Sequence, residues 1–429
     1  MASGPTERVV RTGVEDIVLR VRDAEPLVYG AFVDCNMATA WVQDEYRIFP
    51  GKHGEDPVWG PADHLRMGSG PVPSSALTRS EPELVRLDLP PNAPAGSAGL
   101  HGAVWFESIH QDTRDPSGHT LYALYHNENY PQTLPWDEAS GTGLRDHDWP
   151  PGLLGDGSVQ AVPRIGVMRS TDAGASWDDR GILLEDGDDR MIRLPVNRNF
   201  CFPGGVGDPS AVACGDHLYV FFGEYAYPEA WSAGGWDAPT EAAAQCIGVA
   251  RVPLEDLDEP TGRARRWDGV AFEALWDGAG APIRSLQIDD ADGGGPVSQG
   301  DRRYYWGPSV SWNEHLGVWV MLMGRVDGPF WVGDSVFVSI NTEADLGAGD
   351  ASQRWSTPVE LLSRPGRTLW YPALQPTDEP DDVAGRRSGI RLGRRARLFV
   401  KDIPRGDLVS GQDRYGSDHL VELEREVQP

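Results

Sequence analysis

The sequence predicts an all-β protein, a five-bladed β-propeller with four-stranded antiparallel blades around a central funnel. Pairs of short apolar segments joined by turns recur five times along the 429 residues, with no long amphipathic helix between them. The composition combines 51 Gly, 35 Pro and 16 Trp. Gly and Pro mark tight turns, and indole rings fill the gaps between neighbouring sheets. Repetition on this scale is typical of blades arranged about an axis.

Each of the five hairpins consists of two short runs separated by a turn. They are Ala31–Val42 with Glu45–Phe49, Ala103–Ile109 with Thr120–His126, Pro209–Cys214 with Leu218–Gly223, Pro308–Trp312 with Val318–Gly324, and Tyr371–Leu374 with Ala396–Val400. Third strands are expected at Ile165–Ser170, Cys246–Val252 and Ser335–Ile340, and outer strands near Trp177, Trp267 and Trp355.

The ring is expected to be closed by the strand near Ile17–Val21 or by the one at His419–Glu424. Residues 1–429 are predicted to form a single propeller domain, with a long surface loop at about 51–99. A domain boundary inside that Gly- and Pro-rich loop would split the ring of blades, so we favour one domain.

The net charge of −27 argues against nucleic acid or an anionic membrane as partner, because both are polyanions that bind basic surfaces. Met1–Thr12 lacks the apolar run of a secretory signal, and no apolar run approaches the roughly 18–20 residues that span a bilayer. The four cysteines have no CxxC spacing, which indicates reduced thiols. We therefore expect a cytoplasmic protein with a small-molecule partner. The oligomeric state is left open.

The segment Ser170–Trp177 fits the pattern S-x-D-x-G-x-x-W. In a hairpin, the Asp accepts backbone N–H bonds and the Gly supplies a positive φ. The motif resembles the Asp-box of sialidase-type propellers. That resemblance implies a structural role for Asp172 on the outside of the fold, away from any active centre.

Three acidic residues open successive inner strands: Asp34, Glu107 and Asp208. The equivalent positions in the last two blades are Gly307 and the neighbourhood of Tyr371. Inner strands of a propeller converge on the funnel, so we expect the three acids to meet there. Each also has a structural alternative, as a turn residue or as a hydrogen-bonded strand residue.

At these residues the chain resembles the five-bladed glycosidase group, which contains arabinanases, xylosidases and fructan hydrolases. The opening Asp208-Pro209-Ser210, followed by Leu218–Phe222, is similar to the strand pairs of that group. The chain also resembles an uncharacterised bacterial propeller family, through Asp34-Cys35-Asn36 in the first blade and Tyr125–Glu128 in the second. The resemblance implies an Asp base or nucleophile, a Glu acid and a second Asp that tunes the acid. The order of the Glu and the second Asp departs from the group.

Glycoside cleavage needs a neutral carboxylic acid and an ionised carboxylate. We expect Glu107 to be the acid, because Trp105 and Phe106 flank it and an apolar setting favours the neutral form. Asp34 is then the base or nucleophile, and Asp208 holds a substrate hydroxyl or adjusts Glu107. Substrate-binding residues are expected among the polar and aromatic side chains near the same strand ends: Asn36, His126, Glu128, Glu224, Trp306, Arg325 and Tyr371.

The predicted function is a glycoside hydrolase that acts on a small oligosaccharide or glycoside. No nucleotide-binding or metalloprotease motif occurs, so neither a cofactor nor a required metal is expected. The alternatives are a glycoside phosphorylase, a non-catalytic carbohydrate-binding propeller, and a lyase or isomerase that uses His126 and tyrosines. The spacing of the working carboxyl groups, which separates retaining from inverting enzymes, is not predicted.

Overall fold

The computed structural model describes most of the chain. The described residues are 7–14, 16–29, 33–56, 60–63, 65–77, 83–84, 86–88, 102–129, 161–186, 202, 204–226, 231–232, 235–236, 245–278, 280–288, 303–327, 331–349, 353–379, 388–405 and 414–426.

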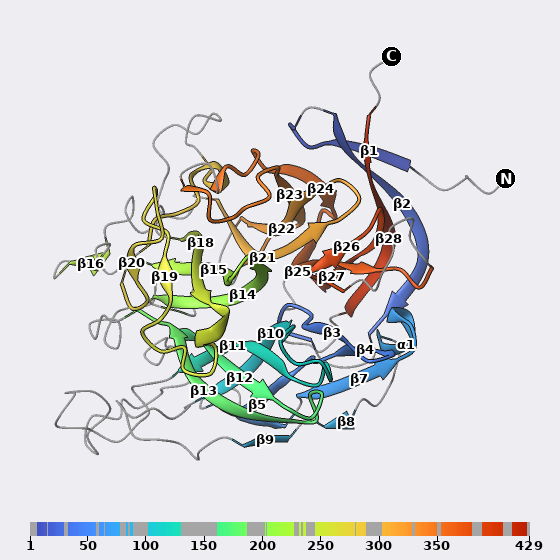
Figure 1. Ribbon diagram of the computed structural model, residues 1–429. Helices are drawn as coiled ribbons and strands as arrows, with labels where there is room; N and C mark the ends of the chain where they lie inside the picture. The colour runs from blue at the N-terminus through green and yellow to red at the C-terminus, as the bar shows by residue number, and fades with distance from the viewer. Residues whose placement is uncertain are drawn as a thin grey trace.

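Five sheets surround a central axis, which confirms the predicted five-bladed propeller (Figure 1). From the axis outward, blade 1 is β3 (Thr39–Val42), β4 (Glu45–Ile48), β7 (Arg66–Gly70) and β8 (Glu83–Leu84). Blade 2 is β10 (Ala103–Gln111), β11 (Leu121–Asn129), β12 (Val162–Ser170) and β13 (Ser176–Leu184). Blade 3 is β14 (Gly205–Cys214), β15 (His217–Ala226), β18 (Cys246–Pro253), β19 (Arg265–Arg266) and β20 (Ala274–Leu275).

Blade 4 is β21 (Tyr304–Asn313), β22 (Val318–Val326), β23 (Ser335–Asn341) and β24 (Val359–Ser363). Blade 5 is β25 (Arg367–Pro376), β27 (Arg395–Pro404), β28 (Arg414–Arg425), β2 (Ile17–Val28) and β1 (Glu7–Arg11). Shorter elements extend these sheets: β5 (Lys52–Asp56) and β6 (Gly60–Asp63) beside β10, β9 (Arg86–Asp88) beside β13, and β26 (Arg391–Leu392) beside β21. A separate pair is β16 (Trp231–Ser232) and β17 (Gly235–Trp236), and the helix α1 spans Pro73–Leu77.

Both candidate closing strands take part in closure, because they pair with each other. The register runs antiparallel from Ile17 opposite Arg425 to Val28 opposite Gly416. The N-terminal strands β1 and β2 therefore form the outer edge of the last blade, beside β28 (Figure 1). This pairing joins the start of the chain to its end through backbone hydrogen bonds, so the ring does not open at blade 5.

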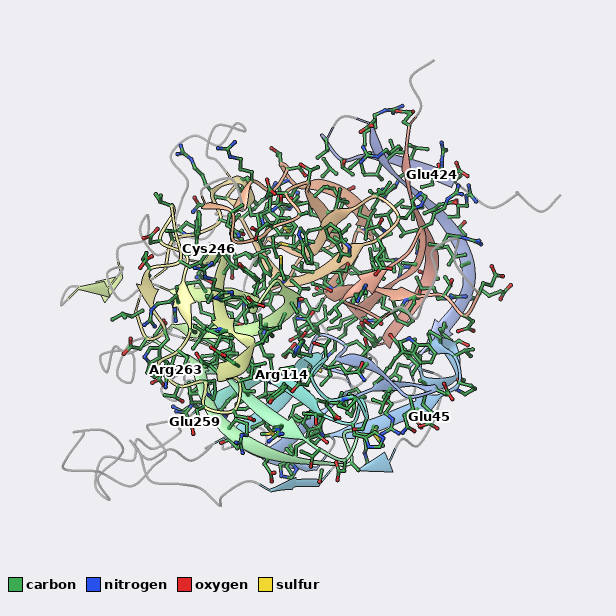
Figure 2. All side chains as sticks on the ribbon, in the orientation of Figure 1. Glu45, Arg114, Cys246, Glu259, Arg263 and Glu424 are labelled. Atoms are coloured by element: carbon green, nitrogen blue, oxygen red, sulfur yellow. The ribbon has the colours of Figure 1, made fainter. Side chains whose placement is uncertain are left out.

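The apolar core is divided into clusters that lie between neighbouring blades. One cluster joins blades 1 and 2, where the ring of Trp177 meets Phe49 and Phe106 edge-on at 5.5 Å and 4.9 Å. Others join blades 2 and 3, 3 and 4, and 4 and 5. A further cluster surrounds the axis near Glu107 and is rich in buried Trp and Tyr: Tyr29, Tyr46, Trp105, Tyr225, Trp306, Trp331, Tyr371 and Tyr415. Charged side chains such as Glu45, Glu259 and Glu424 lie at the periphery (Figure 2).

The structure places the predicted hairpins on β3–β4, β10–β11, β14–β15, β21–β22 and β25–β27. The first strand begins at Thr39 instead of Ala31, and residues 33–38 are not part of a strand. Residues 51–99, which the sequence predicts to be one surface loop, contain β5 to β9 and α1 in their described part, and β7 is the third strand of blade 1. Of the three outer tryptophans, Trp177 lies in β13, whereas Trp267 follows β19 and Trp355 precedes β24.

The turn between β12 and β13 carries the S-x-D-x-G-x-x-W segment. Asp172 accepts hydrogen bonds from Ser176 N at 2.9 Å and from the Ser170 hydroxyl at 2.8 Å, and Gly174 has φ +92°. These contacts give Asp172 a local role in the turn. Of the cysteines, Cys35 and Cys214 are free thiols, and Cys201 lies outside the described residues. Within the described part of the chain, no helix has the length and apolarity to cross a membrane.

Candidate active site

The inner strands of blades 3, 4 and 5 share one irregularity, in which a residue before proline has a left-handed backbone. These residues are Asp208 (φ +49°), Gly307 (φ +64°) and Tyr371 (φ +50°). Each lies where the register of its hairpin shifts, between Gly207 and Ser210, Trp306 and Ser309, or Trp370 and Ala373. The sequence prediction that these three positions are equivalent is confirmed.

Glu107 occupies the corresponding place in blade 2, where the β10–β11 register shifts between Phe106 and Ser108. Bulges of this kind re-aim a side chain and are common beside active sites. A left-handed backbone at a residue other than Gly or Asn costs on the order of 1–3 kcal/mol. The strained backbone at Asp208 and Tyr371 therefore points to a functional constraint at this end of the axis.

Glu107, His126 and Asp208 form one buried cluster. A side-chain oxygen of each acid and a ring nitrogen of His126 all lie within 4.8 Å of one another. The His126 Nδ1 atom accepts a hydrogen bond of 3.1 Å from the backbone N–H of Asp208, so the ring proton is on Nε2. A Cβ on Gly207 would lie 2.4 Å from that Nδ1, so only glycine allows this approach. Burial lowers the pKa of His126 to about 3, which leaves the ring neutral.

The Asp208 carboxyl group is held by two donors from blades 3 and 4. The hydroxyl of Tyr225 and the indole N–H of Trp306 both donate to Oδ2, the latter at 2.9 Å. Burial raises the pKa of Asp208 to about 7, although these two hydrogen bonds oppose the rise. Asp208 is therefore a rigidly held group that titrates near neutral pH.

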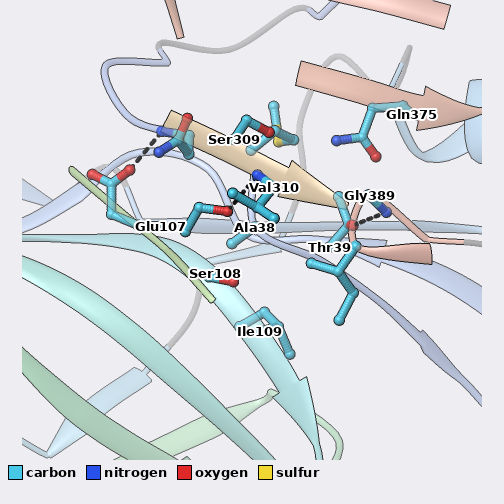
Figure 3. Close-up of a pocket in the computed structure, with 13 residues that line it drawn as sticks. Ala38, Thr39, Glu107, Ser108, Ile109, Ser309, Val310, Gln375 and Gly389 are labelled. Atoms are coloured by element: carbon cyan, nitrogen blue, oxygen red, sulfur yellow. Dashed lines mark hydrogen bonds between the residues drawn. The ribbon is translucent and has the colours of Figure 1, made fainter. Parts of the chain in front are cut away.

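Glu107 on β10 is deeply buried, with 3% of its surface exposed. Its Oε2 accepts the backbone N–H of Asn36 at 2.6 Å (Figure 3). Burial raises the pKa of Glu107 well above its usual range, and the nearby charge of Asp208 raises it further. Burial therefore favours the neutral form of Glu107, the form that a proton donor requires.

Asp34 differs from the other two acids because it is paired with a cation. Its Oδ1 lies 2.7 Å from Nζ of Lys401, whose side chain is 4% exposed, whereas that of Asp34 is 32% exposed. The Lys401 ammonium also lies 5.5 Å from the ring centre of Trp370. The charge of Asp34 raises the pKa of both Glu107 and Asp208, so Asp34 belongs to the same site. The site thus combines a carboxylate paired with a cation and a buried acid whose neutral form is favoured.

Aromatic rings surround this cluster. Trp306 stacks on Trp331 at 5.7 Å and lies 5.2 Å from Tyr371, and Phe202 contacts both Tyr225 and Trp331. Several buried polar atoms here have no hydrogen-bond partner among the described residues: Asn36 Oδ1, Trp105 Nε1, His126 Nε2 and Trp331 Nε1. Buried polar atoms are normally satisfied. Unsatisfied donors and an acceptor beside aromatic rings suit a ligand rich in hydroxyl groups.

Two of the predicted substrate-binding residues form ion pairs away from this cluster. Glu224 binds the fully buried Arg266 at 3.1 Å, next to Asp186, and Arg325 binds Asp327 at 3.0 Å. Glu128 lies at the end of β11, half-buried and two residues from His126, so it shares a strand face with His126. The structure brings Asp34, Asn36, Glu107, His126, Asp208, Trp306 and Tyr371 together, and it does not bring Glu224 or Arg325 to them.

Three residues of the candidate site were not predicted from the sequence: Tyr225, Trp331 and Lys401. Lys401 follows the apolar run Leu398–Val400, and a buried lysine in such a strand needs a partner. The sequence therefore indicates that Lys401 needs a partner, but it does not show which residue the partner is. Trp331, with φ +53°, had no local signal.

The donor set of Glu107, His126 and Asp208 also includes the ligand types of divalent metal ions. The absence of a required metal stays a prediction.

No protein-family model matches the chain, and no curated protein does either. Among solved structures, the native arabinanase Arb43A of Bacillus subtilis is 9% identical over 93% of this chain and 97% of that chain, with a TM-score of 0.41. An α-L-arabinofuranosidase from Lactobacillus brevis is 10% identical over 95% and 97%, with a TM-score of 0.47. The catalytic domain of the Coprinopsis cinerea GH62 α-L-arabinofuranosidase is 8% identical over 94% and 96%, with a TM-score of 0.45. Similarities this distant assign neither an activity nor a residue role to the chain.

Proposed function

We propose that this protein hydrolyses a glycosidic bond in a small oligosaccharide or glycoside. The observation that carries the proposal is the presence of two unlike carboxyl groups at one end of the axis. Glu107 is buried with a raised pKa, and Asp34 is a partly exposed carboxylate paired with Lys401. This division into a neutral acid and an ionised carboxylate is the one that glycoside cleavage needs.

In this proposal Glu107 protonates the leaving oxygen, and Asp34 acts as base or nucleophile. Asp208 maintains the proton on Glu107, because its charge disfavours a second negative charge nearby and so raises the pKa of Glu107. The Nε2–H of His126, the indole N–H of Trp105 and the side-chain carbonyl oxygen of Asn36 are available to sugar hydroxyls. Trp306 and Tyr371 form part of the aromatic wall beside them.

The test is a panel of aryl glycosides and short oligosaccharides, assayed with the wild-type protein and with Asp34→Asn and Glu107→Gln. Both variants are expected to lose about 10²–10⁴-fold in kcat/KM on a substrate with a poor leaving group. On an aryl glycoside with a good leaving group, Glu107→Gln should lose much less than Asp34→Asn, because such a leaving group does not need protonation. Asp216→Asn, in the exposed β14–β15 turn, is the matched control.

If both site variants match the wild type on a good substrate, this assignment is wrong. Turnover that depends on inorganic phosphate would identify a glycoside phosphorylase instead. Binding of oligosaccharides without turnover would identify a carbohydrate-binding propeller.

A further inference from the structure

A second cavity lies at the opposite end of the axis from Glu107. It is lined by residues at the ends of the inner strands of blades 1 to 4 and has a volume of about 650 Å³. Gln111, which lines it, lies four residues beyond Glu107 on β10, a separation of roughly 13 Å along a strand. The size is within the range of roughly 300–1,000 Å³ of small-molecule sites.

A narrow polar pocket lies between Glu107 and the second cavity. Ser108, Ser210, Ser309 and Gln375 line it, and it begins at Glu107 and ends at Thr39 and Gly389 (Figure 3). Its volume is about 20 Å³, enough for about one water molecule. A sugar ring does not fit in this pocket, so a ligand of the second cavity does not reach Glu107 through it.

Two tryptophans form apolar surfaces in the second cavity, and each packs against a buried aromatic ring. Trp41 packs edge-on against Tyr46 at 5.4 Å, and Trp312 packs against Trp319 at 4.8 Å. Both are partly exposed, whereas the supporting Tyr46 and Trp319 are buried. Held in this way, the indole rings lose little conformational freedom when a ligand stacks on them.

Charged groups are few among the described residues that line the cavity, although the protein carries a net charge of −27. None of the described residues that line it is acidic. Its Arg391 side chain donates to Glu314, at 3.0 Å from Nε, and burial lowers the pKa of His110 to about 4. The remaining polar groups are amides and hydroxyls such as those of Gln111 and Thr113, and Gln111 Nε2 is held by the carbonyl of Gly118 at 2.9 Å.

From the fixed indole surfaces, the amide and hydroxyl groups and the lack of free charge among the described lining residues, we propose that this cavity is a second binding site for a neutral oligosaccharide. Sugars offer apolar C–H faces for stacking and hydroxyl groups for hydrogen bonds. A neutral sugar suits a cavity whose described lining holds no acidic residue and one paired arginine. The site binds ligand without cleaving it, and it does not depend on the activity proposed for the opposite end.

The test is isothermal titration with neutral arabino-, xylo- and galacto-oligosaccharides, and with oligogalacturonides as the charged comparison. Ala213→Trp places a bulky ring in the cavity from an exposed position, and Trp312→Ala removes one stacking surface. Both are expected to weaken the binding of a neutral oligosaccharide by about tenfold or more, the equivalent of about 1.4 kcal/mol. Asp34→Asn, at the other end of the axis, should leave this binding in place.

The proposal is overturned if no neutral oligosaccharide binds, if oligogalacturonides bind as tightly, or if Ala213→Trp leaves all binding intact. Ala213→Trp is a surface change, so it tests the site even if Trp312→Ala fails to fold. Because the measurement is binding, failure of the proposed hydrolysis would not affect it. Conversely, an Ala213→Trp protein that still turns over an aryl glycoside but no longer binds oligosaccharide in the cavity would support both the second binding site and the proposed hydrolysis.

Discussion

Nζ of Lys401 lies 2.7 Å from Oδ1 of Asp34, and this contact joins the last blade to the first at the candidate site. Lys401 belongs to β27 of blade 5, and Asp34 precedes β3 of blade 1. The ion pair therefore forms only when the ring of blades closes. It places the ionised carboxylate beside the two buried acids.

Lys401→Met should lower kcat/KM at neutral pH by about tenfold or more, because the Asp34 carboxylate loses the ion pair that holds it in the site. Lys401→Arg, which keeps the charge, should retain most of the activity. Steady-state kinetics check this, and an unchanged kcat/KM in Lys401→Met would show that the pair has no part in the reaction.

Asp208→Asn should shift the alkaline limb of the pH–rate profile to lower pH. The charge of Asp208 raises the pKa of Glu107, so removing that charge lowers it, and the proton donor is lost at a lower pH. The asparagine can still accept the bonds from Tyr225 and Trp306 through its amide oxygen. An alkaline limb that stays in place would contradict the assignment of Glu107 as the acid.

The same residue should make stability depend on pH. Burial raises the pKa of Asp208 in the folded protein to about 7, from the usual 3.8 of an aspartic acid. The folded state therefore binds more protons than the unfolded state between these values, and the free energy of unfolding should fall as pH rises through this window, by at most about 1.4 kcal/mol per pH unit. Urea unfolding at pH 5 and pH 7 measures the fall, and Asp208→Asn should reduce it. If the free energy of unfolding falls equally in wild type and variant, the pH dependence does not come from Asp208.

Gly207→Ala should lower activity without unfolding the protein. A Cβ at this position would meet the His126 ring, displacing Nδ1 from the backbone N–H of Asp208. Gly215→Ala is the control, since a Cβ there meets nothing within 4 Å and its cost comes from its φ of +57° alone. Kinetics together with circular dichroism distinguish the two. Comparable activity in both variants would show that the His126 contact does not position the site.

Arg266→Met should destabilise the protein by about 3–5 kcal/mol, because it leaves Glu224 and Asp186 buried without their cation. Arg11→Met is the comparison, because it breaks a surface pair with Glu426 and should cost no more than about 1 kcal/mol. Urea denaturation of both variants measures the difference. Equal effects would mean that the buried ion cluster contributes no more than a surface pair.

The blades and their inner acidic residues follow from the amino-acid sequence alone. Alternation of apolar segments with Gly- and Pro-rich turns is a local property, so the hairpins around Pro209–Gly223 and Pro308–Gly324 are predictable from short stretches of chain. The equivalence of Asp208, Gly307 and Tyr371 is also local, because the proline after each position marks the bulge. The aromatic neighbours of Glu107 likewise predict that it is the acid.

The grouping of side chains from different blades, in contrast, depends on how the whole chain packs. Lys401 and Asp34 are 367 residues apart, and nothing local specifies that they meet. Glu224 was predicted to bind substrate, but it is paired with Arg266 instead. A buried carboxyl group needs a nearby cation or hydrogen-bond donor, and the packing of the chain decides which one lies close to it. Turns and strands depend on short-range backbone preferences, whereas the pairing of buried charges depends on the closure of the whole ring.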